Sequence, residues 1–213
     1  MKGSLAVNTR AVGALLSADG VAMTMGPDRE FEELRTARLV VRRFRPADVP
    51  TFAAYRSDPE VARYQSWDVP FSEEQAERFV DGLWKDDPDT PGSWFQFAVA
   101  EAAGGAHVGD VAAHVDAEEP RQGRVGITIA AEAQGRGYGT EALAALLDYL
   151  LIDRGKHRVT ADCDARNGAS VNLLERVGMR REAHHLRSSW WKGEWTDEYV
   201  YAVLAEDWSA RRG

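Results

Sequence analysis

The chain has 213 residues, of which 44% are hydrophobic and 28% are charged, and its formal net charge at pH 7 is −8. This length suits one domain with a single core, and the excess of acidic residues argues against a nucleic-acid partner. No apolar run is long enough to span a membrane. The single cysteine, Cys163, excludes an internal disulfide framework and a cysteine-rich metal site. We therefore expect a cytoplasmic protein that binds no metal, membrane or nucleic acid.

Residues 1–33 differ in character from the rest of the chain. They are rich in small residues and show no sustained periodicity, and their short apolar piece is interrupted by Arg10 and Asp19. Such a piece, without a convincing cleavage site, does not have the pattern of a signal peptide. We interpret residues 1–33 as a flexible N-terminal extension and expect the folded domain to occupy residues 34–210.

The first half of that domain mixes strand and helix patterns. Alternation of apolar and polar residues predicts a strand within 36–45, and Pro46 opens a helix. Ser72 and Gln75 have the spacing of a capping box and predict the start of a second helix. Consecutive strand-like runs then follow at 94–100, 107–115 and 124–130.

The second half alternates helix and strand patterns. Leucines at helical spacing predict a helix after residue 140, and 158–164 has the pattern of a strand. A short helix follows from Asn167 and is closed by Gly178, and the tail predicts two strands around a turn at Lys192. This order predicts a mixed α/β sheet in which a meander leads into a parallel crossover.

Gly135, Gly137 and Gly139 alternate with other residues at the start of the long helix. Free N–H groups at a helix N-terminus suit an anion, and glycine allows a ligand to approach the backbone closely. A Walker A loop does not fit, because Thr140 follows Gly139 without a lysine. A dinucleotide-binding fingerprint fits formally as G-x-G-x-x-A, but too few strand–helix units remain after it to build that fold.

The segment from Gln134 to Gly139, QGRGYG, resembles the Q/R-x-x-G-x-G/A acyl-CoA pattern of the GNAT acyltransferase superfamily. Four other segments resemble, in order, the branch that includes the ribosomal-protein N-terminal acetyltransferases: TARLVVRRFRPAD, YRSDPEVARYQSW, NGASVNLLERVGM and KGEWTDEYVYAVL. The resemblance covers residues 36–208. It implies a mostly antiparallel sheet with a splayed parallel central pair, flanked by helices, and acetyl-CoA as co-substrate.

The resemblance also implies a cofactor site. Backbone N–H groups of 135–140 would hold the pyrophosphate, and the backbone next to the splayed strand would pair with the pantetheine arm. The residues carried over are Ile129, Ala130, Ala131, Gln134, Gly135, Arg136, Gly137, Tyr138, Gly139, Thr140, Asn167 and Ser170.

The implied activity is transfer of an acetyl group to a primary amine by direct attack in a ternary complex. Ser170 is the catalytic candidate, as proton donor to the departing thiolate, because Leu174 stands where many superfamily members have a tyrosine. We interpret Cys163 as a structural residue of a strand. The general base stays open among water and five side chains: Asp110, His114, Glu182, His184 and His185.

Two other functions stay open from the sequence. One is a non-catalytic acyl-CoA sensor or interaction module, and the more remote one is an NAD-binding protein. The partners that we expect are acetyl-CoA and an amine acceptor, with the chain acting as a monomer or a homodimer. Aromatic and acidic residues of the tail, among them Trp190, Trp191 and Trp195, fit either sheet packing or contact with a cationic amine.

Overall fold

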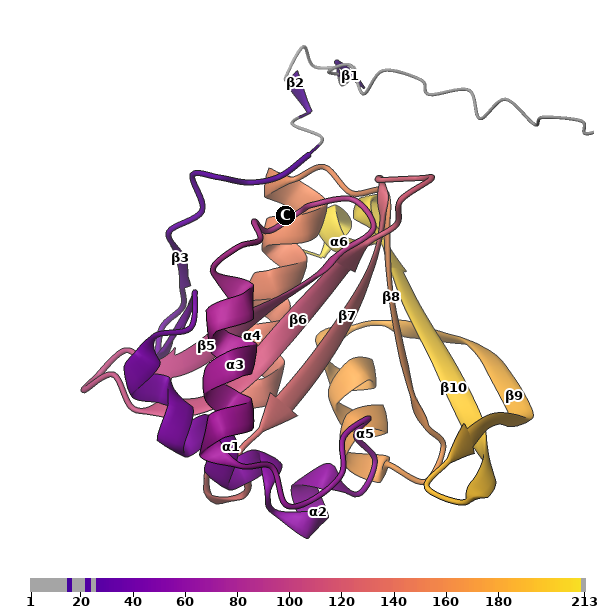
Figure 1. The fold of residues 1–213 in the computed structure, drawn as a ribbon. Helices are drawn as coiled ribbons and strands as arrows, with labels where there is room; N and C mark the ends of the chain where they lie inside the picture. Colours follow the sequence, from indigo (N-terminus) through magenta and orange to yellow (C-terminus); the bar gives the residue numbers. More distant parts are fainter. Residues whose placement is uncertain (1–14, 17–21, 24–25, 212–213) are drawn as a thin grey trace, which may run out of the picture.

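The structure is a computed structural model that describes residues 15–16, 22–23 and 26–211. Its main element is an eight-stranded sheet in the order β3-β4-β5-β6-β7-β8-β10-β9 (Figure 1). The strands are β3 (Glu33–Arg35), β4 (Leu39–Arg42), β5 (Trp94–Glu101), β6 (His107–Val115), β7 (Gln122–Ile129), β8 (Arg158–Asp164), β9 (Arg180–Trp191) and β10 (Glu194–Leu204). A separate two-stranded sheet pairs β1 (Leu15–Leu16) with β2 (Ala22–Met23).

Helices cover the large sheet on both faces. The helices are η1 (Pro46–Asp48), α1 (Val49–Arg56), α2 (Pro59–Ala62), α3 (Glu73–Leu83), η2 (Ala131–Ala133), α4 (Tyr138–Asp148), η3 (Tyr149–Asp153), α5 (Gly168–Val177) and α6 (Ala205–Ala210). Helices α1 and α3 lie over one face, and α4 lies over the other (Figure 1). The predicted capping box is present at the start of α3, where the Ser72 hydroxyl accepts from the Gln75 N–H and the Gln75 side chain accepts from the Ser72 N–H.

The strands of the large sheet are antiparallel except at one place. β7 and β8 run parallel and pair only over Gln122–Arg124 and Arg158–Thr160. Beyond this short ladder the two strands diverge, and α5 lies in the opening (Figure 1). The predicted sheet with a splayed parallel central pair is therefore confirmed. The mostly antiparallel order also excludes the doubly wound parallel fold that the dinucleotide-binding alternative requires.

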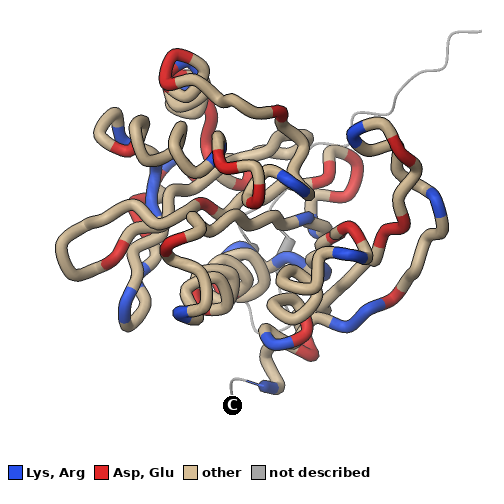
Figure 2. Tube along the Cα trace, turned by 90° about the horizontal axis from the view of Figure 1, so that it is seen from below, with Lys and Arg blue, Asp and Glu red and all other residues tan. Residues whose placement is uncertain are grey.

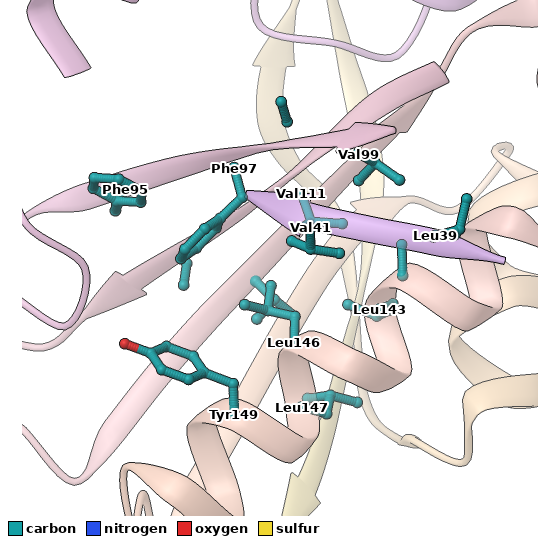
Figure 3. Close-up of a cluster of buried hydrophobic side chains, with 14 of the residues drawn as sticks. Leu39, Val41, Phe95, Phe97, Val99, Val111, Leu143, Leu146, Leu147 and Tyr149 are labelled. Carbon is teal, nitrogen blue, oxygen red and sulfur yellow. The ribbon is translucent and has the colours of Figure 1, made fainter. Parts of the chain in front are cut away.

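Leucines of α4 and apolar residues of β4, β5 and β6 form the centre of the core (Figure 3). Leu143 and Leu146 of α4 are fully buried, as are Val41 and Val111 of the strands they face. Each such side chain contributes about 1.5–3 kcal/mol when it leaves water. This packing fixes the start of α4 relative to the strands and therefore sets where the glycine loop lies.

Part of residues 26–33, which the sequence assigns to a flexible extension, contacts the domain. Phe31 is buried and meets the rings of Phe97 and Tyr149 edge-on. The Tyr149 hydroxyl donates to Asp28 at 2.8 Å. The sequence did not predict these contacts, because they depend on side chains that are distant in the chain. The other residues of the expected extension (1–14, 17–21 and 24–25) lie outside the described part of the chain.

Charged positions are distributed over the whole trace, with acidic and basic residues interspersed (Figure 2). In the described residues, no helix combines the length and the apolar character that a membrane span needs.

Candidate active site

The glycine loop presents a row of free backbone N–H groups at the start of α4. Gly135 and Gly137 have φ values of 74° and 79°, in the left-handed region that favours glycine. None of the N–H groups of residues 135–140 has a hydrogen-bond acceptor in the described part of the chain. Together with the partial positive charge of the helix end, this row suits an anion such as a pyrophosphate.

Gly139 also has a role in packing, in addition to the place beside the ligand that the sequence predicts for it. A Cβ atom at this position would lie 2.6 Å from Cδ1 of Leu173, on α5, and close to Ile129 and Ile127 of β7. By contrast, a Cβ on Gly135 would meet nothing within 4 Å. Glycine at 139 therefore allows α4, α5 and β7 to pack closely, whereas glycines 135 and 137 supply the turn.

A cavity of about 420 Å³ lies beside this loop, between α2, β7, α4 and α5. Most residues of the expected cofactor site line it: Ile129, Gln134, Gly135, Gly137, Tyr138, Gly139, Thr140, Asn167 and Ser170. Three do not. Ala130 is fully buried and its N–H donates to the Val108 carbonyl of β6, while Ala131 and Arg136 are exposed outside the cavity lining.

The backbone of β7 turns its free groups toward the gap left by β8. Because the Ala130 N–H bonds to β6, alternation along the antiparallel ladder directs the N–H and C=O of Ile129 and Ile127 away from β6. The Gln134 side chain already donates to the Ile129 carbonyl at 2.9 Å. The remaining groups are oriented to pair with an extended, amide-containing ligand in the gap.

The start of α5 borders this gap from the other side. The Asn167 side chain accepts from the Ser170 N–H at 3.1 Å and thus caps the helix. Both residues line a small cavity of about 100 Å³, which also contacts Cys163 and the buried Leu174. Burial and neighbouring carboxylates raise the pKa of the Cys163 thiol to about 12. The thiol is therefore protonated at neutral pH and is a poor nucleophile.

A third cavity, of about 530 Å³, lies on the other side of the opening. Tyr64, Gln65 and Ile127 line all three cavities, so these residues mark the place where the cavities meet. Tyr64 and Gln65 come from the loop after α2 and were not predicted as site residues. The only signal in the sequence was the segment YRSDPEVARYQSW, because its position over the site depends on the fold.

The large cavity is lined by more carboxylates than cations. Its carboxylates are Asp110, Asp162, Asp164, Asp197 and Glu198, and its cations are Arg56 and Arg124. Asp164 pairs with Arg166, and Asp197 accepts from the Arg187 N–H and from His184; these contacts hold the pKa of both carboxyls below the usual range. These two groups are therefore occupied by contacts within the protein.

Glu198 differs from these neighbours. Within the described residues its side chain forms no hydrogen bond or ion pair, and the charged neighbours that act on it are Asp162, His185 and Arg124. Burial, followed by the charge of Asp162, raises its pKa, while His185 and Arg124 act in the opposite direction. The sequence places Glu198 among the acidic residues of the tail that could contact a cationic amine, but it is not among the five candidate bases, because its position in a cavity depends on the pairing of β10 with β8.

Of the five candidate bases from the sequence, only Asp110 lines the large cavity. It is buried, receives hydrogen bonds from Tyr55 and Gln96, and has a pKa raised by burial. Arg158 and Arg180 hold the pKa of Glu182 at about 2, which makes this residue a weak base. The three histidines line none of the three cavities.

Trp191 lines the large cavity, while the exposed Trp190 and Trp195 pack edge-to-face against each other on the β9–β10 hairpin. Across the described ranges, no group of three or more histidine, cysteine or acidic side chains is arranged to hold a metal ion.

The anion cradle at the start of α4 and the splayed β7–β8 pair are the two features that the resemblance to the GNAT superfamily implies. A family model described as an acetyltransferase (GNAT) domain matches residues 38–180. An uncharacterized N-acetyltransferase of Bacillus subtilis, YnaD, is 30% identical over 176 residues, which are 83% of this chain and 99% of the relative. The [ribosomal protein uS5]-alanine N-acetyltransferase of Escherichia coli is 31% identical over 88 residues, 41% of this chain and 45% of that enzyme.

Solved structures agree with these matches. A GNAT-family acetyltransferase from Bacillus anthracis has a TM-score of 0.73 and 29% identity, covering 82% of this chain and 99% of that one. The spermidine N-acetyltransferase of Vibrio cholerae in complex with CoA and spermine shares the fold, with a TM-score of 0.69 at 20% identity and coverage of 82% and 99%. The chain belongs to the GNAT acetyltransferase family and is an acyltransferase.

Proposed function

We propose that this enzyme transfers the acetyl group of acetyl-CoA to a primary amine by direct attack of the amine on the thioester. The observation that carries the proposal is the meeting of the cavities at Tyr64, Gln65 and Ile127. An acyl donor in the cavity beside the glycine loop and an acceptor in the acidic cavity would come together at this point. Their contact in a ternary complex requires no covalent intermediate on the protein.

The acidic cavity supports an amine as the acceptor. An ammonium group that enters it would meet the negative charge of Glu198, next to Asp162, which pairs with Arg124 at 3.4 Å. The raised pKa of Glu198 makes this carboxylate a better proton acceptor than a free glutamate. We propose that Glu198 takes the first proton from the ammonium, directly or through a water molecule.

The proposed acetyl transfer requires neither a metal nor a redox partner. The amine nitrogen attacks the acetyl carbon and forms the amide bond while the carbon–sulfur bond breaks, and the nitrogen loses its second proton. The CoA thiolate takes one proton, for which the Ser170 hydroxyl at the start of α5 is the proposed donor, and the second proton of the nitrogen passes to the Ser170 oxygen, directly or through water, so that the serine ends neutral. A backbone N–H of Ile127 or Ile129 would polarise the thioester carbonyl, since these groups are directed into the gap.

Release of free thiol from acetyl-CoA tests this function across a panel of amines that includes N-terminal peptides, polyamines, aminoglycosides and amino acids. We expect at least one class to support turnover that depends on both substrates. Binding of CoA without thiol release on a broad panel would instead favour the non-catalytic acyl-CoA module. Tight binding of NAD without binding of CoA would contradict the placement of the cofactor.

A further inference from the structure

Arg38 lies outside the glycine loop in the sequence but contacts it directly. It occupies the turn that precedes β4, and its guanidinium donates through Nη1 to the carbonyl of Arg136 at 2.9 Å. The same guanidinium lies over the ring of Tyr138, 4.9 Å from its centroid. A Cβ atom on Gly137 would be 3.4 Å from Nη2 of Arg38. The side chain therefore supports the loop at consecutive positions, 136 to 138.

Glu141 holds Arg38 in this place. Nε of Arg38 donates to Oε2 of Glu141 at 2.7 Å, and Nη2 is 2.6 Å from the same oxygen. The other oxygen, Oε1, accepts from the Arg38 N–H at 2.9 Å and from the Thr36 hydroxyl at 2.6 Å. These contacts hold the pKa of Glu141 below its usual range. One carboxylate in the first turn of α4 thus fixes the 36–38 turn against the loop.

This arrangement solves two physical problems of an anion cradle. Two left-handed glycines make the loop flexible when it is free, so ordering it on the ligand reduces affinity unless other contacts order it first. A carboxylate in the first turn of α4 also lies next to the place proposed for the pyrophosphate, where its charge would repel the ligand. Arg38 fixes the Arg136 carbonyl and at the same time neutralises Glu141.

We propose that Arg38, oriented by Glu141, is a positioning residue that holds the loop in the conformation that receives the pyrophosphate of the acyl donor. This inference rests on the proposed function, because it assumes that acyl-CoA binds at the loop. Arg38 acts through the loop and not as a ligand of the reacting atoms. Arg38 should therefore strengthen the binding of acyl donors that carry a pyrophosphate and have no effect on the binding of donors that lack one.

The test compares acetyl-CoA with S-acetyl-N-acetylcysteamine, which keeps the thioester and one amide but has no pyrophosphate. Arg38→Met keeps most of the apolar stem and removes every donor, and Glu141→Gln removes the charge that orients the arginine. Arg35→Met is the matched control, because Arg35 is exposed and pairs with Glu33 on the edge of the sheet. Calorimetric titration with CoA is run on every variant together with the kinetics.

We expect Arg38→Met to raise the KM for acetyl-CoA and the Kd for CoA about tenfold or more, since charge-assisted hydrogen bonds are lost, with kcat nearly unchanged. The kcat/KM for the cysteamine thioester stays within about twofold, and Arg35→Met behaves as wild type. The double variant Arg38→Met/Glu141→Gln should have a KM for acetyl-CoA and a Kd for CoA close to those of the more affected single variant, because the two residues act as one unit.

Equal losses with both donors would mean that Arg38 only supports the fold, and unchanged CoA binding in Arg38→Met would mean that it does not position the loop; either result overturns the inference. A failure of the proposed function gives a different result. If wild type binds CoA but acetylates no amine, the proposed function fails, while the Kd values for CoA still decide the role of Arg38.

Discussion

Substitution of Gly137 by aspartate places a negative charge inside the proposed pyrophosphate cradle. Aspartate tolerates the left-handed backbone better than most residues, and the new Cβ would lie 3.4 Å from Nη2 of Arg38, a contact that needs only a small adjustment. At about 5 Å between the new carboxylate and a phosphate charge, and an effective dielectric constant of about 20, the repulsion is about 3 kcal/mol. The nearby Arg38 reduces this value, so we expect CoA to bind about 10- to 100-fold more weakly.

Calorimetric titration with CoA measures this effect, and Gly137→Asn is the matched control. Asparagine has nearly the same size and the same tolerance of the left-handed region, so the difference between the two variants isolates the charge. That difference should shrink as the salt concentration rises, because exposed charges are screened. Melting temperatures confirm that both variants are folded. If both bind CoA as tightly as wild type does, the pyrophosphate does not lie at this loop.

Further predictions concern the packing and the chemistry of the site. Gly139→Ala should destabilise the protein by about 1–3 kcal/mol in chemical denaturation, because its Cβ would overlap with Leu173 on α5; an unchanged midpoint would contradict the close packing. Ser170→Ala should lower kcat by about 10²-fold if the hydroxyl protonates the thiolate, and a drop below about threefold would remove Ser170 from the catalytic residues. Glu198→Gln should lower kcat/KM by about 10²-fold at neutral pH. Since the base acts as a carboxylate, wild-type kcat/KM should fall as the pH drops through its raised pKa, and a variant that kept this acidic limb would exclude Glu198 as the base.

Local signals in the sequence predicted most elements of the fold. The leucine spacing that places Leu143 and Leu146 in the core is a property of one helix, and so is the capping box at Ser72. The splayed strand pair came from the family resemblance, because no local pattern shows where two parallel strands separate. The docking of residues 26–33 was missed for a related reason. Phe31 is buried only because Phe97 and Tyr149, far away in the chain, provide the surface that it covers.

The two sides of the candidate site also differ in how much of each the sequence could predict. The sequence named individual residues on the proposed cofactor side, because that side is built from one continuous loop and one helix start, and most of these residues line the cavity beside the loop. On the acceptor side the sequence named only the acidic and aromatic tail, because Tyr64 and Gln65 come from the loop after α2, Glu198 comes from β10, and these two segments meet only in the folded protein. The sequence also suggested Glu182 as a base, but ion pairs with Arg158 of β8 and with Arg180, two residues earlier on β9, hold its pKa at about 2. Ion pairs formed in the folded protein therefore decide which carboxylates can still act as proton acceptors.

The short ladder between β7 and β8 links these features. A parallel pair that continued past Arg124 and Thr160 would close the gap and consume the Ile127 and Ile129 backbone groups in strand pairing. The separation leaves those groups directed at the gap, and the capped start of α5 borders the same space with Asn167 and Ser170. In the proposed reaction, the donor would enter from the side of α4 and the acceptor from the acidic cavity. Since the Cys163 thiol in this gap is protonated at neutral pH, the geometry favours direct transfer between two bound substrates over transfer through the protein.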